Sequence, residues 1–131
     1  MYAKKFLQLA SDIAETSVRF GNAKVGAILV YRNKVVSYAT NGGKSNPFFA
    51  KYGKNEYAIY PHAETKCLWI AQKLGFEKFN MSTLYVARVK QDNSMALSKP
   101  CNGCERAIRD FSIQRVVYTI DDAYYGTMEV L

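Results

Sequence analysis

The chain has 131 residues, 49% of them apolar and 14% aromatic, which is enough to build the core of one domain. Its longest apolar run, residues 25–31, is far shorter than the ~20 residues that cross a bilayer. The basic pair Lys4-Lys5 is followed after two residues by the polar Gln8, whereas a secretory signal would continue with a long apolar stretch. Three cysteines, two of them in a C-x-x-C pair, favour metal chemistry in a reducing compartment over a disulfide framework. We therefore expect a single domain over residues 1–131, soluble and cytoplasmic.

The formal net charge of +7 is unevenly distributed. No Asp or Glu occurs between Glu15 and Glu56, whereas basic and acidic residues are equal in number outside this stretch. Two interpretations stand side by side: a solvated surface that keeps the protein soluble, or attraction to an anionic substrate or a nucleic acid. The seven cations are Arg19, Lys24, Arg32, Lys34, Lys44, Lys51 and Lys54.

The first half of the chain predicts a helix and a hairpin. Apolar residues at helical spacing predict an amphipathic helix over residues 2–19 that packs on a sheet. Two antiparallel strands follow at 23–31 and 35–40, rich in Val, Ile and Tyr, with a tight turn at 32–34. Residues 41–61 show no clear period, so we expect a long functional loop. The apolar stripe of the helix comprises Tyr2, Phe6, Leu9 and Ile13.

The second half alternates helices and strands. Its last two strands should be parallel, because a helix connects them by a right-handed crossover. Residues 121–131 give no clear prediction. In order, the predicted elements are a helix at 62–74 ended by Gly75, a strand at 81–90, a polar loop at 95–99, a helix at 101–111 and a strand at 116–120.

Two short motifs carry residues that bind transition metals. Pro61-His62-Ala63-Glu64 opens one predicted helix, and Pro100-Cys101-Asn102-Gly103-Cys104 opens another. Proline favours the start of a helix, so it places both motifs in a first turn. In the middle of a helix, His62 and Glu64 would point about 200° apart, whereas a first turn lets both serve one metal off the helix end. We therefore expect two helix N-termini to converge on one cation.

The ligand set indicates a catalytic zinc site. His62, the only histidine, and the thiolates of Cys101 and Cys104 supply three ligands, which leaves the fourth tetrahedral position for water. Zinc lowers the pKa of its bound water to about 7, and Glu64 can take the proton of that water and hand it to a leaving amine. This is the chemistry of hydrolytic deamination, with the zinc-bound water as nucleophile and Glu64 as proton shuttle.

Cys67 offers an alternative to this interpretation. As a fourth ligand it would close the site into a structural Cys₃His zinc, and the chain would be a non-catalytic, zinc-stabilised binding protein. Helix geometry argues against this, because a side chain five residues after His62 points about 140° away around the helix and lies a turn further along. We expect Cys67 to be a small core residue.

The two motifs resemble those of the zinc-dependent cytidine and deoxycytidylate deaminase superfamily. The resemblance extends from Val25-Gly26-Ala27 to Tyr118 and includes the order of the elements. It implies an α/β fold with three αβα layers, in which a mixed sheet of about five strands lies between helices. Free-nucleoside cytidine deaminases usually have Cys where this chain has His62, so His-Ala-Glu favours the deoxycytidylate, cytosine, guanine and tRNA-adenosine branches.

Further segments resemble deoxycytidylate deaminases. Thr40-Asn41-Gly42 looks like their Tyr-Asn-Gly, and Arg115-Val116-Val117-Tyr118 is similar to part of their C-terminal half. Residues 41–47, with Asn41, Lys44, Ser45 and Pro47, and residues 52–55 look more like small phage-encoded deaminases, which would place a viral protein in the host cytoplasm. The resemblance implies zinc on His62, Cys101 and Cys104, proton shuttling by Glu64, main-chain contact to the base from Ala63, and substrate binding by Asn41.

The activity we expect is deamination of a cytosine deoxynucleotide, dCMP to dUMP plus ammonia, with Zn2+ as cofactor. The expected partner is a small-molecule nucleotide, and the resemblance also implies a homo-oligomer. Lys44, Lys51 and Lys54 lie between Asn41 and His62 in the chain, so we expect at least one of them to contact the substrate phosphate. The alternative is a base deaminase acting on single-stranded DNA or tRNA, which would engage many of the cations at once.

Overall fold

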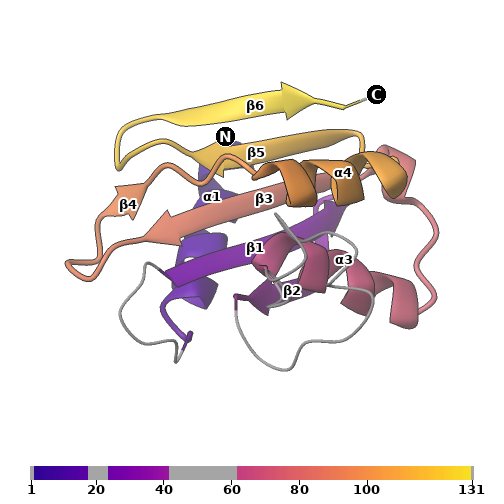
Figure 1. The fold of residues 1–131 in the computed structure, drawn as a ribbon, viewed down its shortest axis with the longest axis horizontal. Helices are drawn as coiled ribbons and strands as arrows, with labels where there is room; N and C mark the ends of the chain where they lie inside the picture. The colour runs from indigo at the N-terminus through magenta and orange to yellow at the C-terminus, as the bar shows by residue number, and fades with distance from the viewer. Residues whose placement is uncertain (1, 18–23, 42–61, 131) are drawn as a thin grey trace.

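A computed structural model of the chain describes residues 2–17, 24–41 and 62–130. In these residues a mixed sheet has one helix on one face and two on the other, which confirms the expected three-layer αβα fold (Figure 1). No helix in these ranges is long and apolar enough to cross a membrane. The helices are α1 (Tyr2–Ala14), α3 (Ala63–Lys73) and α4 (Asn102–Asp110), and a short 3-10 helix η1 covers Phe79–Met81.

The main path of the sheet runs β2-β1-β3-β5-β6, and a short strand, β4, pairs with β3 beside this path. β3 and β5 are parallel, as predicted, and α4 lies in the connection between them. Every other neighbouring pair is antiparallel. The bounds are β1 Lys24–Tyr31, β2 Lys34–Thr40, β3 Thr83–Val89, β4 Met95–Ala96, β5 Arg115–Thr119 and β6 Tyr125–Glu129.

The predicted hairpin is confirmed between β1 and β2. Tyr31 pairs with Lys34, so only Arg32 and Asn33 form the turn. Both residues have positive φ angles, 52° and 62°, as in the mirror-image turns whose twist matches that of paired strands. Asparagine tolerates this left-handed conformation better than most residues, so residue 33 suits the turn.

The core lies on both faces of the central strands. In β1, Ala27 and Leu29 face α3 and α4, whereas Ile28 and Val30 face α1. All four are buried, so this part of β1 is a continuous apolar run, as expected for a strand covered on both sides. The two helical layers are therefore held to the sheet by separate sets of side chains.

The first helix is shorter than predicted. It ends at Ala14, and the main-chain N–H groups of Thr16 and Ser17 bond three residues back, to Ile13 and Ala14. The prediction for residues 15–17 was wrong, because these tighter bonds end the α-helical ladder. Residues 18 and 19 of the predicted helix lie outside the described residues. The prediction that Leu9 packs on the sheet was also wrong, because Leu9 is 38% exposed. Leu7 and Ala10 are the buried residues in this part of α1.

Two later segments differ from the sequence prediction. The loop expected at 95–99 begins with β4, because a tight turn, with Asn93 at a φ of 68°, brings the chain back onto β3. The ambiguous segment 121–131 contains β6, which adds an antiparallel edge strand to β5.

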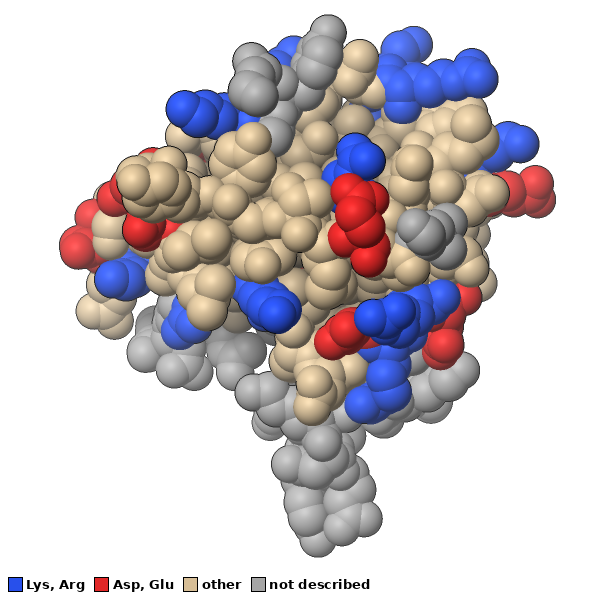
Figure 2. Space-filling model, turned by 90° about the horizontal axis from the view of Figure 1, so that it is seen from above, with Lys and Arg blue, Asp and Glu red and all other residues tan. Residues whose placement is uncertain are grey.

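Figure 2 shows the face seen from above, where Lys and Arg side chains are interspersed with Asp and Glu.

Candidate active site

His62 lies at the N-terminal end of α3. It is the N-cap residue, with an extended backbone (φ −84°, ψ 156°), and its carbonyl accepts the first helical hydrogen bond, from Lys66 N at 3.0 Å. Glu64 is then the second residue of the helix. This confirms that both side chains belong to a helix start, although Pro61 itself lies outside the described residues.

Cys101 holds the equivalent place on α4. It is the N-cap residue (φ −72°, ψ 172°), and its carbonyl accepts a hydrogen bond from Glu105 N at 2.8 Å. Cys104 is the third residue of this helix and is fully buried. The N-terminus of a helix carries unpaired N–H groups and a partial positive charge, which favour thiolate ligands there.

The two helix starts meet in one cluster of potential metal ligands. His62 Nδ1 lies 3.2 Å from Cys104 Sγ and 3.5 Å from Cys101 Sγ, and all three ligand atoms lie within 4.8 Å of one another. With Zn–S near 2.3 Å and Zn–N near 2.0 Å, tetrahedral geometry requires N···S separations of about 3.5 Å. The separations in this structure fit one zinc ion.

The two cysteines of this cluster have pKa values shifted in opposite directions. A hydrogen bond from Cys104, aided by His62, lowers the pKa of Cys101 to about 3, although partial burial opposes the shift. The same hydrogen bond, together with burial, raises the pKa of Cys104. Both sulfurs must be deprotonated to bind a divalent cation, so metal binding at this cluster releases protons.

Glu64 is a carboxylate in a buried position. Its residue is 6% exposed, and burial raises the pKa of its carboxyl group, while a main-chain hydrogen bond and His62 oppose the shift. Glu64 is not among the described residues whose ligand atoms group around one metal position. A carboxyl group beside a metal cluster but outside its ligand set suits proton transfer.

The structure places two more predicted residues. Ala63 is fully buried at the first position of α3, where main-chain N–H groups have no intrahelical acceptor. Asn41 follows β2, and its Oδ1 accepts a hydrogen bond from Val25 N at 3.0 Å, while its own N–H donates to Val25 O at 3.2 Å. These bonds fix the amide of Asn41 at the start of β1. Lys44, Lys51 and Lys54 lie outside the described residues.

A pair of hydroxyl groups, in the segment before Cys101 and at the end of β5, was missed in the sequence. Ser98 and Thr119 are both buried, and their side-chain oxygens are 2.9 Å apart. Neither residue belongs to a motif, and 20 residues separate them in the sequence. Only the position of Ser98, three residues before Cys101, hinted at a role.

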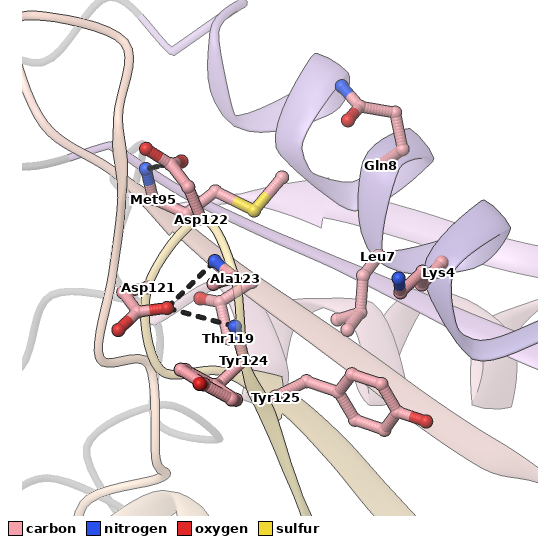
Figure 3. Close-up of a pocket in the computed structure, with 10 residues that line it drawn as sticks. All are labelled: Lys4, Leu7, Gln8, Met95, Thr119, Asp121, Asp122, Ala123, Tyr124 and Tyr125. Carbon is pink, nitrogen blue, oxygen red and sulfur yellow. Dashed lines mark hydrogen bonds between the residues drawn. The ribbon is translucent and has the colours of Figure 1, made fainter.

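A cavity of about 160 Å3 lies between α1 and the turn from β5 to β6 (Figure 3). None of the predicted site residues lines it. Its two carboxylates are engaged in the fold: Asp121 accepts hydrogen bonds from Ala123 N and Tyr124 N, and Asp122 accepts one from Met95 N. This cavity is therefore a feature of the turn and not part of the metal cluster.

The αβα fold, with His-x-Glu and Cys-x-x-Cys at two converging helix starts, defines a zinc-dependent nucleobase deaminase. A sequence profile of the family confirms this assignment. The chain belongs to the family described as "Cytidine and deoxycytidylate deaminase zinc-binding region", which matches residues 1–120. The protein is thus a cytidine-type deaminase with zinc as its cofactor.

Solved structures share this fold. Cytidine deaminase from Burkholderia pseudomallei is 20% identical, with a TM-score of 0.70 over 97% of this chain and 91% of the other. The dCMP deaminase of cyanophage S-TIM5 is also 20% identical, with a TM-score of 0.64 over 90% and 82%. A structure from a study of tRNA:A34 deaminases is 24% identical, with a TM-score of 0.56 over 90% and 76%. No curated protein sequence matches the chain significantly.

Proposed function

We propose that the chain hydrolyses dCMP to dUMP and ammonia, with His62, Cys101 and Cys104 holding the zinc and Glu64 moving the proton. One observation carries this proposal: a buried carboxylate at the second position of α3 lies beside a cluster whose three ligand atoms fit one zinc ion. A purely structural zinc site needs four protein ligands, whereas the described residues bring only these three together.

In this mechanism the chain contributes three groups. Zinc, when bound, supplies a Lewis acid that activates the attacking water. Glu64 accepts the proton of that water and donates it to the amino group that leaves as ammonia. In this proposal the main-chain N–H of Ala63, at the first position of α3, binds the base. Asn41 binds the sugar or base edge through its side-chain NH2 group, because its Oδ1 already accepts a hydrogen bond from Val25 N. The low exposure of Glu64 limits proton exchange with bulk water.

The choice of dCMP rests on charge and on likeness to known proteins. Among the solved structures with this fold is the cyanophage dCMP deaminase in complex with dCMP and dUMP, with a TM-score of 0.63. The acid-free stretch between Glu15 and Glu56 supplies cations for one phosphate, of which Lys44, Lys51 and Lys54 precede His62 most closely. Among the described residues on the face in Figure 2, Lys and Arg side chains are mixed with Asp and Glu, an arrangement that does not favour a polyanion on that face.

A base deaminase acting on nucleic acid is the second candidate, favoured by the fold shared with a tRNA:A34 deaminase. The two candidates are separated by measuring ammonia release from dCMP, deoxycytidine, cytidine, cytosine, dCTP, single-stranded DNA and tRNA. We expect the highest kcat/KM with dCMP. Faster deamination of single-stranded DNA or tRNA would overturn the proposal, and zinc-loaded Glu64→Gln protein serves as the inactive control.

We also propose a homo-oligomer, supported by apolar exposure at the edge of the sheet. Val35 and Tyr38 of β2 are 40% and 61% exposed, and Leu74 at the end of α3 is 69% exposed. They line a common groove of about 540 Å3. Exposed apolar edge strands favour pairing with another chain. Light scattering during gel filtration measures the mass, and a monomer at all concentrations would contradict this proposal.

A further inference from the structure

Two hydroxyl groups attach the segment before Cys101 to the sheet. Ser98 is 7% exposed and Thr119 is 1% exposed, and neither belongs to the ligand cluster. Ser98 precedes Cys101 by three residues, and Thr119 is the last residue of β5. Polar side chains this deeply buried are retained in a fold only when their hydrogen bonds are satisfied.

Thr119 forms one half of the attachment. Its hydroxyl donates to Ala96 O at 2.6 Å, and the same oxygen accepts a hydrogen bond from Arg88 N at 3.2 Å. Ala96 belongs to β4, and Arg88 belongs to β3. One side chain at the end of β5 therefore joins the ends of two other strands.

Ser98 forms the other half. Its Oγ accepts a hydrogen bond from Thr119 N at 2.9 Å, and its N–H donates to Thr119 O at 2.9 Å. The Ser98 hydroxyl proton has three acceptors in reach: Val86 O at 2.8 Å, Thr119 Oγ1 at 2.9 Å and Thr119 O at 3.4 Å. The segment is thus bonded to β3 and β5 through both its main chain and its side chain.

Little chain separates this attachment from the metal cluster. Only Lys99 and Pro100 lie between Ser98 and Cys101, so the Cα of Cys101 is within about 11 Å of the Cα of Ser98. Pro100 is buried, and its ring restricts the backbone further. A second bond, from Met95 N to Asp122 Oδ1 at 2.7 Å, holds the other end of the segment (Figure 3).

We propose that Ser98 and Thr119 are positioning residues, which hold Cys101 at the separation from His62 that one zinc ion requires. The proposal rests on the ligand set of the proposed function. His62 comes from α3 and Cys101 from the end of a different segment, so each must be fixed to the sheet independently. Groups that orient metal ligands typically change metal affinity by about 10–100-fold when they are removed.

Zinc affinity of the whole chain, measured by competition with a chelator of known affinity, tests the proposal. Thr119→Val keeps the shape of the side chain but loses its hydroxyl, and Ser98→Ala removes the partner hydroxyl. We expect each variant to bind zinc about 10–100-fold more weakly than the wild type. Thr119→Ser restores the hydroxyl and should bind zinc like the wild type, which a loss of core packing would not explain.

Ser82→Ala is the matched control. Ser82 is fully buried, and its hydroxyl donates to Lys78 O at 2.7 Å just before β3 begins, whereas Val86 and Arg88 lie further along β3. Melting curves recorded with chelator show that each variant is folded and how much stability it has lost. We expect Ser82→Ala to lower the melting temperature and to leave zinc affinity unchanged.

Two results would overturn the positioning role: wild-type zinc affinity in both Thr119→Val and Ser98→Ala, or an equal loss of affinity in Ser82→Ala. A wild-type protein that binds zinc but deaminates none of the substrates would overturn the proposed function alone, because the zinc affinities still test the positioning role. A wild-type protein that takes up no zinc would overturn both.

Discussion

The Ser37 hydroxyl donates a hydrogen bond to the main-chain oxygen of Cys67 at 2.9 Å, and its Oγ lies 3.3 Å from Cys67 Sγ. These contacts join β2 to the middle of α3 in the core. Cys67 is fully buried and lies outside the described group of potential metal ligands. The third cysteine is therefore a core residue, and the ligand cluster keeps three protein ligands.

Removing the Cys67 thiol should not remove the metal. We expect Cys67→Ala to retain about one zinc ion per chain, as the wild type does, because His62, Cys101 and Cys104 suffice to bind it. Cys104→Ala is the control and should lose most of the zinc. Elemental analysis of the purified proteins measures the ratio. A loss of zinc from Cys67→Ala would indicate a closed structural site and contradict the enzyme mechanism.

Cys67 should also make the free energy of unfolding depend on pH in the alkaline range. Burial raises the pKa of its thiol from about 9 to about 12, so the folded state holds this proton more tightly than the unfolded state does. The stabilising contribution is complete below about pH 9 and is lost as the pH rises toward 12. The difference in free energy of unfolding between the wild type and Cys67→Ala should fall by about 1.4 kcal/mol per pH unit in this range.

Urea unfolding of both proteins at about pH 8 and about pH 11 measures this difference. Comparison with Cys67→Ala cancels the titration of lysines and tyrosines, which both proteins share. An equal difference at the two pH values would mean that the Cys67 thiol is not held neutral by burial.

Glu64→Gln should separate metal binding from turnover. Gln keeps the shape of Glu but cannot move a proton, so we expect unchanged zinc content and a fall in kcat of at least ~10² to 10⁴. Glu105→Gln is the matched control, because Glu105 is an acidic residue in the first turn of α4 and pairs with Arg109 at 3.0 Å. Normal turnover by Glu64→Gln would show that the assigned role is wrong.

The lysines of residues 41–61 should recognise the substrate phosphate. We expect at least one of Lys44→Ala, Lys51→Ala and Lys54→Ala to lower kcat/KM for dCMP and to leave that for deoxycytidine unchanged. Lys34→Ala is a suitable control, because Lys34 begins β2 beside the hairpin turn. If all three variants keep the wild-type preference for dCMP over deoxycytidine, these lysines do not bind the phosphate.

Gly26 should resist substitution because α1 packs closely against β1. A Cβ at this position would clash with the main-chain oxygen of Ala10 and would lie 2.7 Å from Ala14 N, both in the backbone of α1. Overpacking of this kind costs about 1–3 kcal/mol, so Gly26→Ala should lower the urea midpoint. An unchanged midpoint would contradict the close packing of α1 on β1.

Local sequence patterns are sufficient to predict the helices, the hairpin and the ligand set. These follow from local rules: apolar spacing, the turn residues Arg32 and Asn33, and the position of His62 and Cys101 at helix starts. Such rules depend on residues a few positions apart, so they hold without knowledge of the fold. The family and the zinc chemistry follow from two motifs of the same local kind.

Contacts between distant segments become visible only in the folded chain. Leu9 is exposed although its spacing suits the apolar stripe, because the sheet contacts a different side of α1. β4 and β6 are strands because β3 and β5 offer main-chain partners, which their own residues do not indicate. Ser98 and Thr119 are far apart in the sequence, and they meet because Thr119, at the end of β5, lies beside the segment that follows β4. Hydrogen bonds between such distant residues depend on the packing of the whole sheet, and local sequence does not specify that packing.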